Sequence, residues 1–280
     1  MLKKVVFLSI AVLLGAAAVI FLIQQTNTLS TTYFTWQSSR VPPGFDGFRI
    51  VQISDLHAKR FGREQARLLQ IIRDAQPDLI AITGDMIDES TRSLDSVQEL
   101  IAGLHGLAPI YFIDGNHDVR SWLYADMLAL FEQYGVTVLQ GAYFMWHDGI
   151  DTGHRPPDVR LERDGATMTL GAIANFDADI VLIHDPAKFP WYAEDGRDGL
   201  VLAGHMHGGQ VALPNGRAII GPFSGQRMEG LQLSFFPQFS SGVYVDGDAT
   251  MFLSRGLGTS HLPVRAFARP EVAVIDLKAG

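Results

Sequence analysis

The stretch LVLAGHMHGGQVALP, residues 200–214, places two histidines in a glycine-rich turn directly after an apolar run. Residues 200–203 are typical of a buried strand, and His205 and His207 follow its carboxyl end. Glycine permits a tight turn and a close approach of the backbone, so such a turn is able to present both imidazoles. Two interpretations are open at this point: a polar turn that happens to contain histidine, or a pair of metal ligands.

Outward from this stretch, apolar runs of strand length alternate with amphipathic helical patterns. Predicted strands cover residues 48–54, 78–83, 109–114, 136–140, 142–147, 178–184, 199–205, 249–254 and 272–277, and predicted helices cover residues 63–75, 94–104 and 122–135. This alternation is typical of an α/β domain with layered sheets and helices on the outside. Ligands of such domains bind beyond the carboxyl ends of the strands, so chemistry-bearing residues are expected there.

Side chains with ligand chemistry do follow the predicted strands. They occur in the groups Asp55-x-His57, Gly84-Asp85, Gly115-Asn116-His117-Asp118, His184 and Gly204-His205-x-His207. Each group alone is weak evidence for a metal site, because a D-x-H tripeptide or a lone buried histidine is common in chains that bind no metal. Five such groups, each at the carboxyl end of a strand, favour metal ligands over a polar turn.

The chemistry of this residue set is coherent. Two divalent cations about 3.5–4 Å apart can clamp the attacking and leaving oxygens of an in-line displacement at phosphorus. Holding both takes a bridging carboxylate, neutral imidazoles and neutral oxygen donors, since further carboxylates would cancel the positive charge. The candidate ligands are Asp55, His57, Asp85, Asn116, His184, His205 and His207. The chain has no cysteine, which excludes thiolate ligands and disulfides.

The motif order D-x-H, G-D, G-N-H-D, H, G-H-x-H resembles the calcineurin-like metallophosphoesterases. The stretches GHMHGGQVALP (204–214) and SRGLGTSHLPVRAFARPEVAVIDL (254–277) are similar to a membrane-associated or secreted bacterial branch of that family. Members similar to this branch include phosphodiesterases and a UDP-diacylglucosamine pyrophosphatase of lipid A synthesis. The resemblance implies an α/β fold, a layered αββα sandwich over residues 45–280; an apolar run before it, described below, predicts one N-terminal transmembrane helix.

The resemblance also implies a role for each site residue. One divalent metal ion would bind Asp55, His57 and His207, the other Asn116, His184 and His205, with Asp85 as the bridge. His117 would contact the phosphate and assist the leaving group, and Asp118 would orient the His117 ring. Mn, Fe and Zn all suit this mixed nitrogen and oxygen ligation. The sequence departs from the family at Met206, a position that is often small and polar, which bears on access to the site.

The N-terminus carries a candidate membrane anchor. Residues 5–23 are apolar apart from Ser9, and as a helix they would span about 28 Å, close to the thickness of the hydrocarbon core of a bilayer. Lys3 and Lys4 precede this run and no basic residue follows it before Arg40, so the positive-inside rule puts the domain outside the cytoplasm. Residues 1–25 are predicted to be the anchor, with a signal peptide cleaved near residues 16–18 as the alternative, and residues 26–44 a polar linker.

Charge and composition limit the partners. The net charge of −8 argues against nucleic acid, because binding to a phosphate backbone needs a basic surface. The partners expected are a phosphorylated small-molecule or lipid substrate and the membrane that holds the N-terminal helix; no protein partner can be inferred. The apolar residues Leu231, Leu233, Phe235, Phe236 and Phe239 belong either to a strand with one face in the core or to a surface that grips acyl chains.

The sequence therefore predicts a binuclear, metal-dependent phosphoesterase at the cell membrane. The expected reaction is hydrolysis of a phosphoester or pyrophosphate bond in a lipid-linked or nucleotide-sugar substrate. The alternative is an inactive scaffold that keeps the fold for protein binding. His105, His147 and His154 fall outside the motifs and are expected on the surface, whereas Arg255 and His261 are expected to have structural roles, with a phosphate contact as the alternative.

Overall fold

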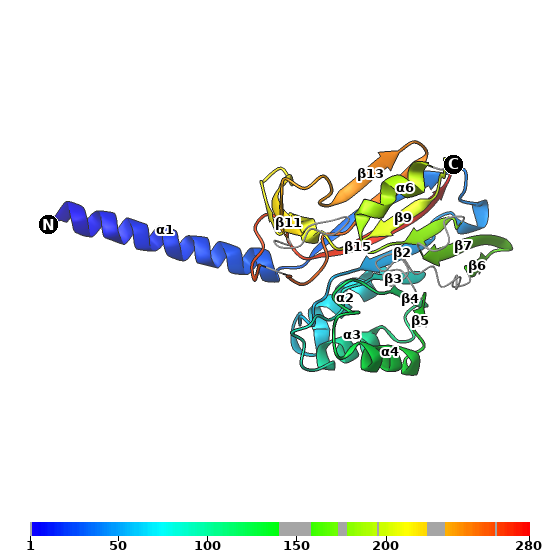
Figure 1. Cartoon of the computed structure of the whole chain (residues 1–280), viewed down its shortest axis with the longest axis horizontal. Helices are drawn as coiled ribbons and strands as arrows, with labels where there is room; N and C mark the ends of the chain where they lie inside the picture. The colour runs from blue at the N-terminus through cyan, green and yellow to red at the C-terminus, as the bar shows by residue number, and fades with distance from the viewer. Residues whose placement is uncertain (1, 140–157, 173–177, 195, 223–232, 261) are drawn as a thin grey trace.

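The computed structural model describes residues 2–139, 158–172, 178–194, 196–222, 233–260 and 262–280, and two six-stranded sheets form the centre of the domain (Figure 1). The first sheet has the order β1 (Ser30–Ser38), β15 (Glu271–Ala279), β2 (Arg49–Ile53), β3 (Leu79–Thr83), β4 (Ile110–Ile113), β5 (Thr137–Val138). The second has the order β13 (Gly242–Asp246), β14 (Ala249–Leu253), β9 (Leu200–Ala203), β8 (Ile180–Leu182), β7 (Ala166–Ala172), β6 (Val159–Arg163).

Apolar side chains from both sheets meet in one core. It includes Ile50 and Ile275 of the first sheet, and Leu170 and Leu202 of the second, all fully buried. A second core lies between the first sheet and the helices α2 (Ala66–Ala75), α3 (Asp95–Leu104) and α4 (Tyr124–Gln133). A third lies between the second sheet and α6 (Phe189–Glu194). The predicted αββα sandwich is therefore confirmed.

The central strands β2, β3 and β4 run parallel, and so do β8, β9 and β14. Every residue of β3, β4 and β9 is buried, because both faces of each strand are covered by side chains. Parallel strands end at the same edge of their sheet. The segments that follow β2, β3, β4, β8 and β9 are consequently brought together at one end of the sandwich.

The segment predicted to be a polar linker, residues 26–44, is not a linker. Residues 30–38 form β1, which pairs in parallel with β15 over its whole length. The alternating aromatic residues explain this strand, because Trp36 is buried in the core between the sheets and Tyr33 on the other face is 68% exposed. The polar composition of the segment hid this period-two pattern.

A third, smaller sheet lies beside the base of the N-terminal helix (Figure 1). It consists of β10 (Val211–Ala212), β11 (Ala218–Pro222) and β12 (Leu233–Phe235), all antiparallel. The strands β10 and β11 were not predicted, whereas β12 lies in the segment for which a strand was one of the two interpretations. The structure describes β12 but not residues 231 and 232, so the expectation for Leu231 lies outside the described residues, as does the predicted strand 142–147.

The helix α1 (Leu2–Asn27) extends away from the domain (Figure 1). Within the described residues it is the one helix long and apolar enough to cross a membrane, with a mean hydropathy of 2.9. Its apolar stretch is not covered by the domain. The short 3₁₀ turns η1 (Pro43–Phe45), η2 (Arg63–Gln65), η3 (Pro186–Lys188) and η4 (His207–Gly209) complete the described elements.

Candidate metal centre

The predicted ligands lie together at the carboxyl edge of the two sheets. Asp55 and His57 follow β2, Asp85 follows β3, and the two histidines of the opening stretch follow β9. Most of these residues have a left-handed backbone: φ is 54° at Asp55, 47° at His57, 55° at Asp85, 75° at His205 and 51° at His207. Each such residue costs roughly 1–2 kcal/mol, and strain of this kind collects at functional sites.

Two groups of side chains offer ligand atoms that all lie within 4.8 Å of one another. One group is Asp55, His57 and His207, and the other is Asp85, His184 and His205. The two groups adjoin, because one carboxylate oxygen, Asp85 Oδ2, lies 3.0 Å from His184 Nε2 and 3.9 Å from His57 Nε2. Asp85 thus stands between the groups, in the place of a bridging ligand.

The side chains of His184 and Asp85 present lone pairs that suit a metal cation. His184 Nδ1 lies 2.7 Å from the carbonyl oxygen of Thr83, which can only accept, so this nitrogen carries the proton. The Nε2 atom of a neutral His184 ring then turns its lone pair towards Asp85 Oδ2. Within the described chain neither atom has a hydrogen-bond partner, and both are buried. Two lone pairs that face each other at 3.0 Å need either a proton between them or a metal cation beside them.

The pKa values agree with this arrangement. Burial alone would lower the pKa of His184, but the charge of Asp85 outweighs burial and raises the pKa well above the ordinary value. Burial alone would raise the pKa of Asp85, but the neighbouring His184 holds it well below the ordinary value. The carboxylate is therefore charged, and a metal ion would replace the proton that His184 otherwise holds.

Asn116 supplies a further candidate ligand atom. Its Oδ1 atom is buried and has no hydrogen-bond partner among the residues that the structure describes. A buried amide oxygen without a partner costs free energy unless another group, such as a cation, compensates it. Asn116 follows β4, the strand next to β3, so its oxygen suits the ligand role expected from the sequence.

His207 is held by a buried arginine that the sequence analysis missed. Burial lowers the pKa of His207 well below its ordinary value, and the nearby His57 and Arg265 lower it further, which keeps the imidazole neutral as a metal ligand must be. Arg265 Nη2 lies 3.2 Å from His207 Nδ1, and Arg265 Nη1 donates to the carbonyl oxygen of His207 at 3.1 Å. Arg265 is fully buried, and burial lowers its pKa to about 9.

The partner of His117 differs from the one that the family resemblance implied. The His117 ring lies beside the first group, with its centroid 5.0 Å from that of His57. Its Nδ1 atom is 2.8 Å from Glu89 Oε2, and its Nε2 atom is 3.3 Å from Ser260 Oγ. Glu89, not Asp118, therefore orients the His117 ring.

Asp118 instead organises the backbone of the metal turns. Its carboxylate accepts hydrogen bonds from the N–H groups of Asp85, Met86, Ile87 and Gly115 at 2.7–3.0 Å. Burial and the charge of Asp85 raise the pKa of Asp118 to about 7. This carboxylate ties the turn after β3 to the turn after β4.

Gly84 shows why these turns need glycine. Its φ of 90° is unfavourable for residues with a side chain, and an added Cβ would lie 2.6 Å from His184 Nδ1. A Cβ on Gly115 would lie 2.2 Å from Asp85 Oδ1. Both glycines let the backbone pass against the metal ligands.

The remaining residues considered in the sequence analysis are not among the candidate metal ligands. Arg255 pairs with Glu271 at 2.8 Å, which supports the structural role expected for it. His105 is exposed, and its Nδ1 lies 3.0 Å from the carbonyl oxygen of Tyr134. His147, His154 and His261 lie outside the described residues. The sequence analysis also missed Asp88, whose carboxylate lies 3.4 Å from His57 Nδ1. The two acidic residues that follow Asp85 by three and four positions could have indicated a contact of this kind.

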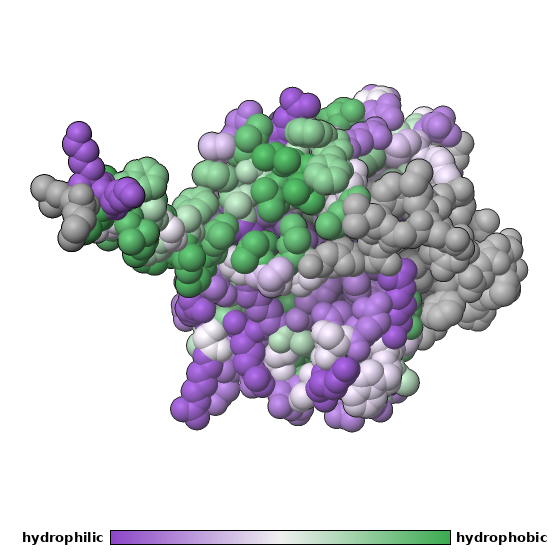
Figure 2. All heavy atoms as spheres, turned by 60° about the vertical axis from the view of Figure 1, so that its left-hand side comes forward, coloured by the Kyte–Doolittle hydropathy of each residue, from purple (hydrophilic) through white to green (hydrophobic). Residues whose placement is uncertain are grey.

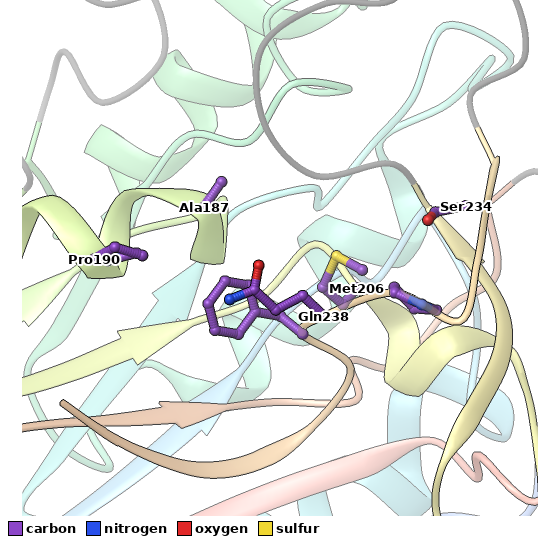
Figure 3. Close-up of a pocket in the computed structure, with 7 residues that line it drawn as sticks. Ala187, Pro190, Met206, Ser234 and Gln238 are labelled. Atoms are coloured by element: carbon purple, nitrogen blue, oxygen red, sulfur yellow. The ribbon is translucent and has the colours of Figure 1, made fainter.

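A cavity of about 160 Å³ adjoins the turn that carries His205 and His207. In Figure 3, Met206 and Gln238 lie between the segment of Ala187 and Pro190 and the strand of Ser234. Met206 itself is fully buried. The methionine that departs from the family pattern therefore shapes the space beside the metal turn.

The fold and this site define a class of protein, and comparison with known families identifies it. Residues 48–209 match the family model described as calcineurin-like phosphoesterase. The chain belongs to this family, which confirms the family predicted from the motifs. The matched residues include each of the seven predicted metal ligands.

Individual proteins that are similar to this chain support the same family. The chain is 32% identical to the uncharacterized metallophosphoesterase YkuE of Bacillus subtilis, over 91% of this chain and 87% of the relative. It is 26% identical to an uncharacterized metallophosphoesterase of Aquifex aeolicus, over 96% and 98% of the two chains. It is also 27% identical to a transmembrane protein with metallophosphoesterase domain of Danio rerio, over 85% of this chain and 55% of that protein.

Proposed function

We propose that this protein is a binuclear metal-dependent hydrolase that cleaves a phosphoester or pyrophosphate bond in a lipid-linked or nucleotide-sugar substrate at the membrane. The observation that carries the proposal is the pair of buried ligand groups that meet at Asp85. An inactive scaffold is disfavoured, because such a protein has no use for a strained backbone at five of the seven ligand positions and, in the part of the chain that the structure describes, buried side-chain atoms without hydrogen-bond partners at four of them.

Two divalent ions, Mn, Fe or Zn, would bind the ligand groups and act as Lewis acids on the phosphoryl oxygens. One ion would bind Asp55, His57 and His207, the other Asn116, His184 and His205, and Asp85 would bind both. Asp88 and Arg265 hold the edges of the His57 and His207 rings and so fix their directions.

His117 is the proposed acid for the leaving group. It lies beside His57 at the edge of the first ligand group and belongs to no ligand group itself. Glu89 fixes its Nδ1 edge, which leaves the Nε2 edge to face the substrate beside Ser260. Water would attack phosphorus and give up a proton to the solvent, and a proton held at Nε2 would pass to the leaving oxygen as its bond to phosphorus breaks.

The proposed membrane setting rests on α1 and on the relatives. The helix has the length and hydropathy of a span, and its lysines lie at its N-terminal end, which favours a domain outside the cytoplasm. Some relatives are described as transmembrane proteins. An anchored enzyme meets a substrate confined to the same surface at a high effective concentration. A substrate such as a lipid-linked pyrophosphate suits that location.

A substrate panel tests the proposal. The purified full chain, loaded with Mn, is assayed on an aryl phosphomonoester, an aryl phosphodiester, a nucleotide-sugar pyrophosphate and a lipid-linked pyrophosphate. We expect the highest kcat/KM on one of the last two, and loss of all activity with a chelator. The variant Asp85→Asn is the matched inactive control. A metal-loaded chain that hydrolyses none of the panel would overturn the proposed function.

A further inference from the structure

Exposed apolar side chains gather on the domain beside the base of α1. Figure 2 shows this face as a hydrophobic area next to the helix. We define the aromatic patch by Leu213, Phe235, Phe236 and Phe267, which are 39%, 64%, 60% and 44% exposed. Phe239, by contrast, is buried. Both interpretations of residues 231–239 therefore apply in part. Phe239 packs in the core, whereas Phe235 and Phe236 lie on the surface.

The aromatic patch is continuous with the apolar part of α1. The Phe267 ring lies 5.1 Å from the Phe21 ring, and Phe21 belongs to the apolar stretch of the helix. The end of α1 is fixed to the domain, because the backbone N–H of Arg265 donates to Thr26 Oγ1 at 2.9 Å and Lys59 Nζ donates to the Thr26 carbonyl oxygen. If α1 spans the bilayer, Phe267 must lie at the level of its boundary.

The backbone of the patch is strained in a way that the domain core does not explain. Phe236 and Phe267 have φ values of 51° and 56°, in the left-handed region that bulky residues rarely adopt. Both side chains point away from the core into exposed positions. Strain of this kind at exposed aromatic residues indicates a function for the exposed side chains.

The charges around the patch suit a lipid surface. The segments that form it, residues 210–222, 233–240 and 262–270, contain no Asp or Glu, although the whole chain has a net charge of −8. They contain three arginines, of which Arg217 and Arg269 are exposed. The Arg217 guanidinium lies over the Phe236 ring, 5.8 Å from its centroid. Aromatic residues interleaved with basic ones are typical of side chains at the boundary between headgroups and acyl chains.

We propose that the aromatic patch inserts into the surface of the bilayer as a second membrane contact in addition to α1. The contact would orient the domain, since a single membrane span would leave α1 and the domain fixed to it free to tilt together in the bilayer. It would also set the height of the metal centre, because Arg265 bonds both Thr26 at the end of α1 and the ligand His207. The metal centre is then held close to the plane of the lipid headgroups.

Depth-dependent quenching tests this contact in the full chain. The protein has no cysteine, so Leu213→Cys and Phe236→Cys each give a single site for an environment-sensitive fluorophore. Each labelled chain is reconstituted into phosphatidylcholine and phosphatidylglycerol vesicles that carry a spin-labelled lipid, with the spin label either near the headgroup or deep in the acyl chain. Leu13→Cys, within α1, serves as the reference for the inserted span.

The matched control is Val245→Cys on β13, an apolar residue that is 67% exposed. Val245 pairs with Thr250 at the start of β14, which runs parallel to β9, so it lies at the edge opposite to the metal centre. We expect labels at positions 213 and 236 to be quenched several-fold more by the shallow spin label than the label at 245, and the label at position 13 to be quenched by the deep one.

Quenching at 213 and 236 no greater than at 245 would overturn the proposal and would leave the patch to a protein partner. Quenching that exceeds the control but falls as salt is added would support the insertion together with the contribution of Arg217 and Arg269. The measurement needs no turnover. Its failure would therefore leave the proposed hydrolase intact, and failure of the substrate panel would leave the membrane contact intact.

Discussion

At the scale of single residues, two carboxylates near His117 act in different ways: that of Glu89 and that of Asp118. Glu89 contacts the His117 ring, and Asp118 accepts four backbone N–H groups of the metal turns. Glu89 therefore positions the ring of His117, the proposed proton donor, and Asp118 stabilises the turns that carry the candidate ligands. Substitutions separate the two roles.

His117→Ala is expected to keep both metal ions and lose much of the rate. General acid catalysis contributes about 10²–10⁴-fold, so the loss should be of that size on an ester with a poor leaving group. A good leaving group needs less protonation, and its ester should lose much less. Steady-state kinetics on a series of aryl esters provides the measurement, with Glu89→Gln expected to show the same trend more weakly. Rates unchanged across the series would remove His117 from the mechanism.

Asp118→Asn is expected to act mainly on stability. The amide keeps the size of the carboxylate, but its NH₂ end cannot accept hydrogen bonds from the backbone. Above the Asp118 pKa of about 7 the carboxylate is charged, and hydrogen bonds to a charged group contribute roughly 1.5–3 kcal/mol, so at such a pH the free energy of unfolding should fall by on the order of 2 kcal/mol. Thermal unfolding of the metal-free protein measures this. A wild-type Tm with a selective loss of leaving-group assistance would instead restore Asp118 as the partner of His117.

At the scale of elements, β1 ties the N-terminal helix α1 to the domain. The strand begins three residues after α1 ends and pairs with β15 from Ser30 to Ser38. It places Trp36 in the core between the two sheets and leaves Tyr33 exposed. The segment between helix and domain is thus an edge of the first sheet, which restricts how far the domain can move from the end of α1.

This strand predicts a contrast between its two faces. Trp36→Ala should lower the free energy of unfolding by about 3–5 kcal/mol, because it removes a buried aromatic side chain and leaves a cavity. Tyr33→Ala, in the same strand on the other face, should change it by less than about 0.5 kcal/mol. Chemical denaturation of both variants supplies the comparison. Equal effects of the two substitutions would mean that residues 30–38 behave as a linker after all.

At the scale of the whole molecule, the sequence was most informative where local pattern and chemistry coincide. The ligands from Asp55 to His207 follow apolar strands directly, so their convergence could be predicted from strand ends. Arg265 could not, because its contact with His207 joins positions 58 residues apart and a buried arginine has no local signal. The pairing of β1 with β15 could not be predicted either, because it joins positions some 240 residues apart.

The orientation of the chain is a further prediction at this scale. Lys3 and Lys4 lie at the N-terminal end of α1, so the domain is expected outside the cytoplasm. A reporter enzyme that folds only outside the cytoplasm, fused after Gly280, should be active, and a cytoplasmic reporter at the same position should be inactive. The fusion follows an exposed C-terminal residue and leaves the domain whole. The reverse pattern would place the metal centre at the inner leaflet.

The central claim is that two metal ions bind where the ligand groups meet and that hydrolysis depends on them. Elemental analysis of the purified chain, with activity on an aryl phosphate ester measured in the same samples, tests it most directly. We predict about two divalent ions per wild-type chain. A variant with both His205→Ala and His207→Ala should lose bound metal and activity together, whereas the surface variant His105→Ala should keep both. Full metal content and full activity in the double variant would contradict the account.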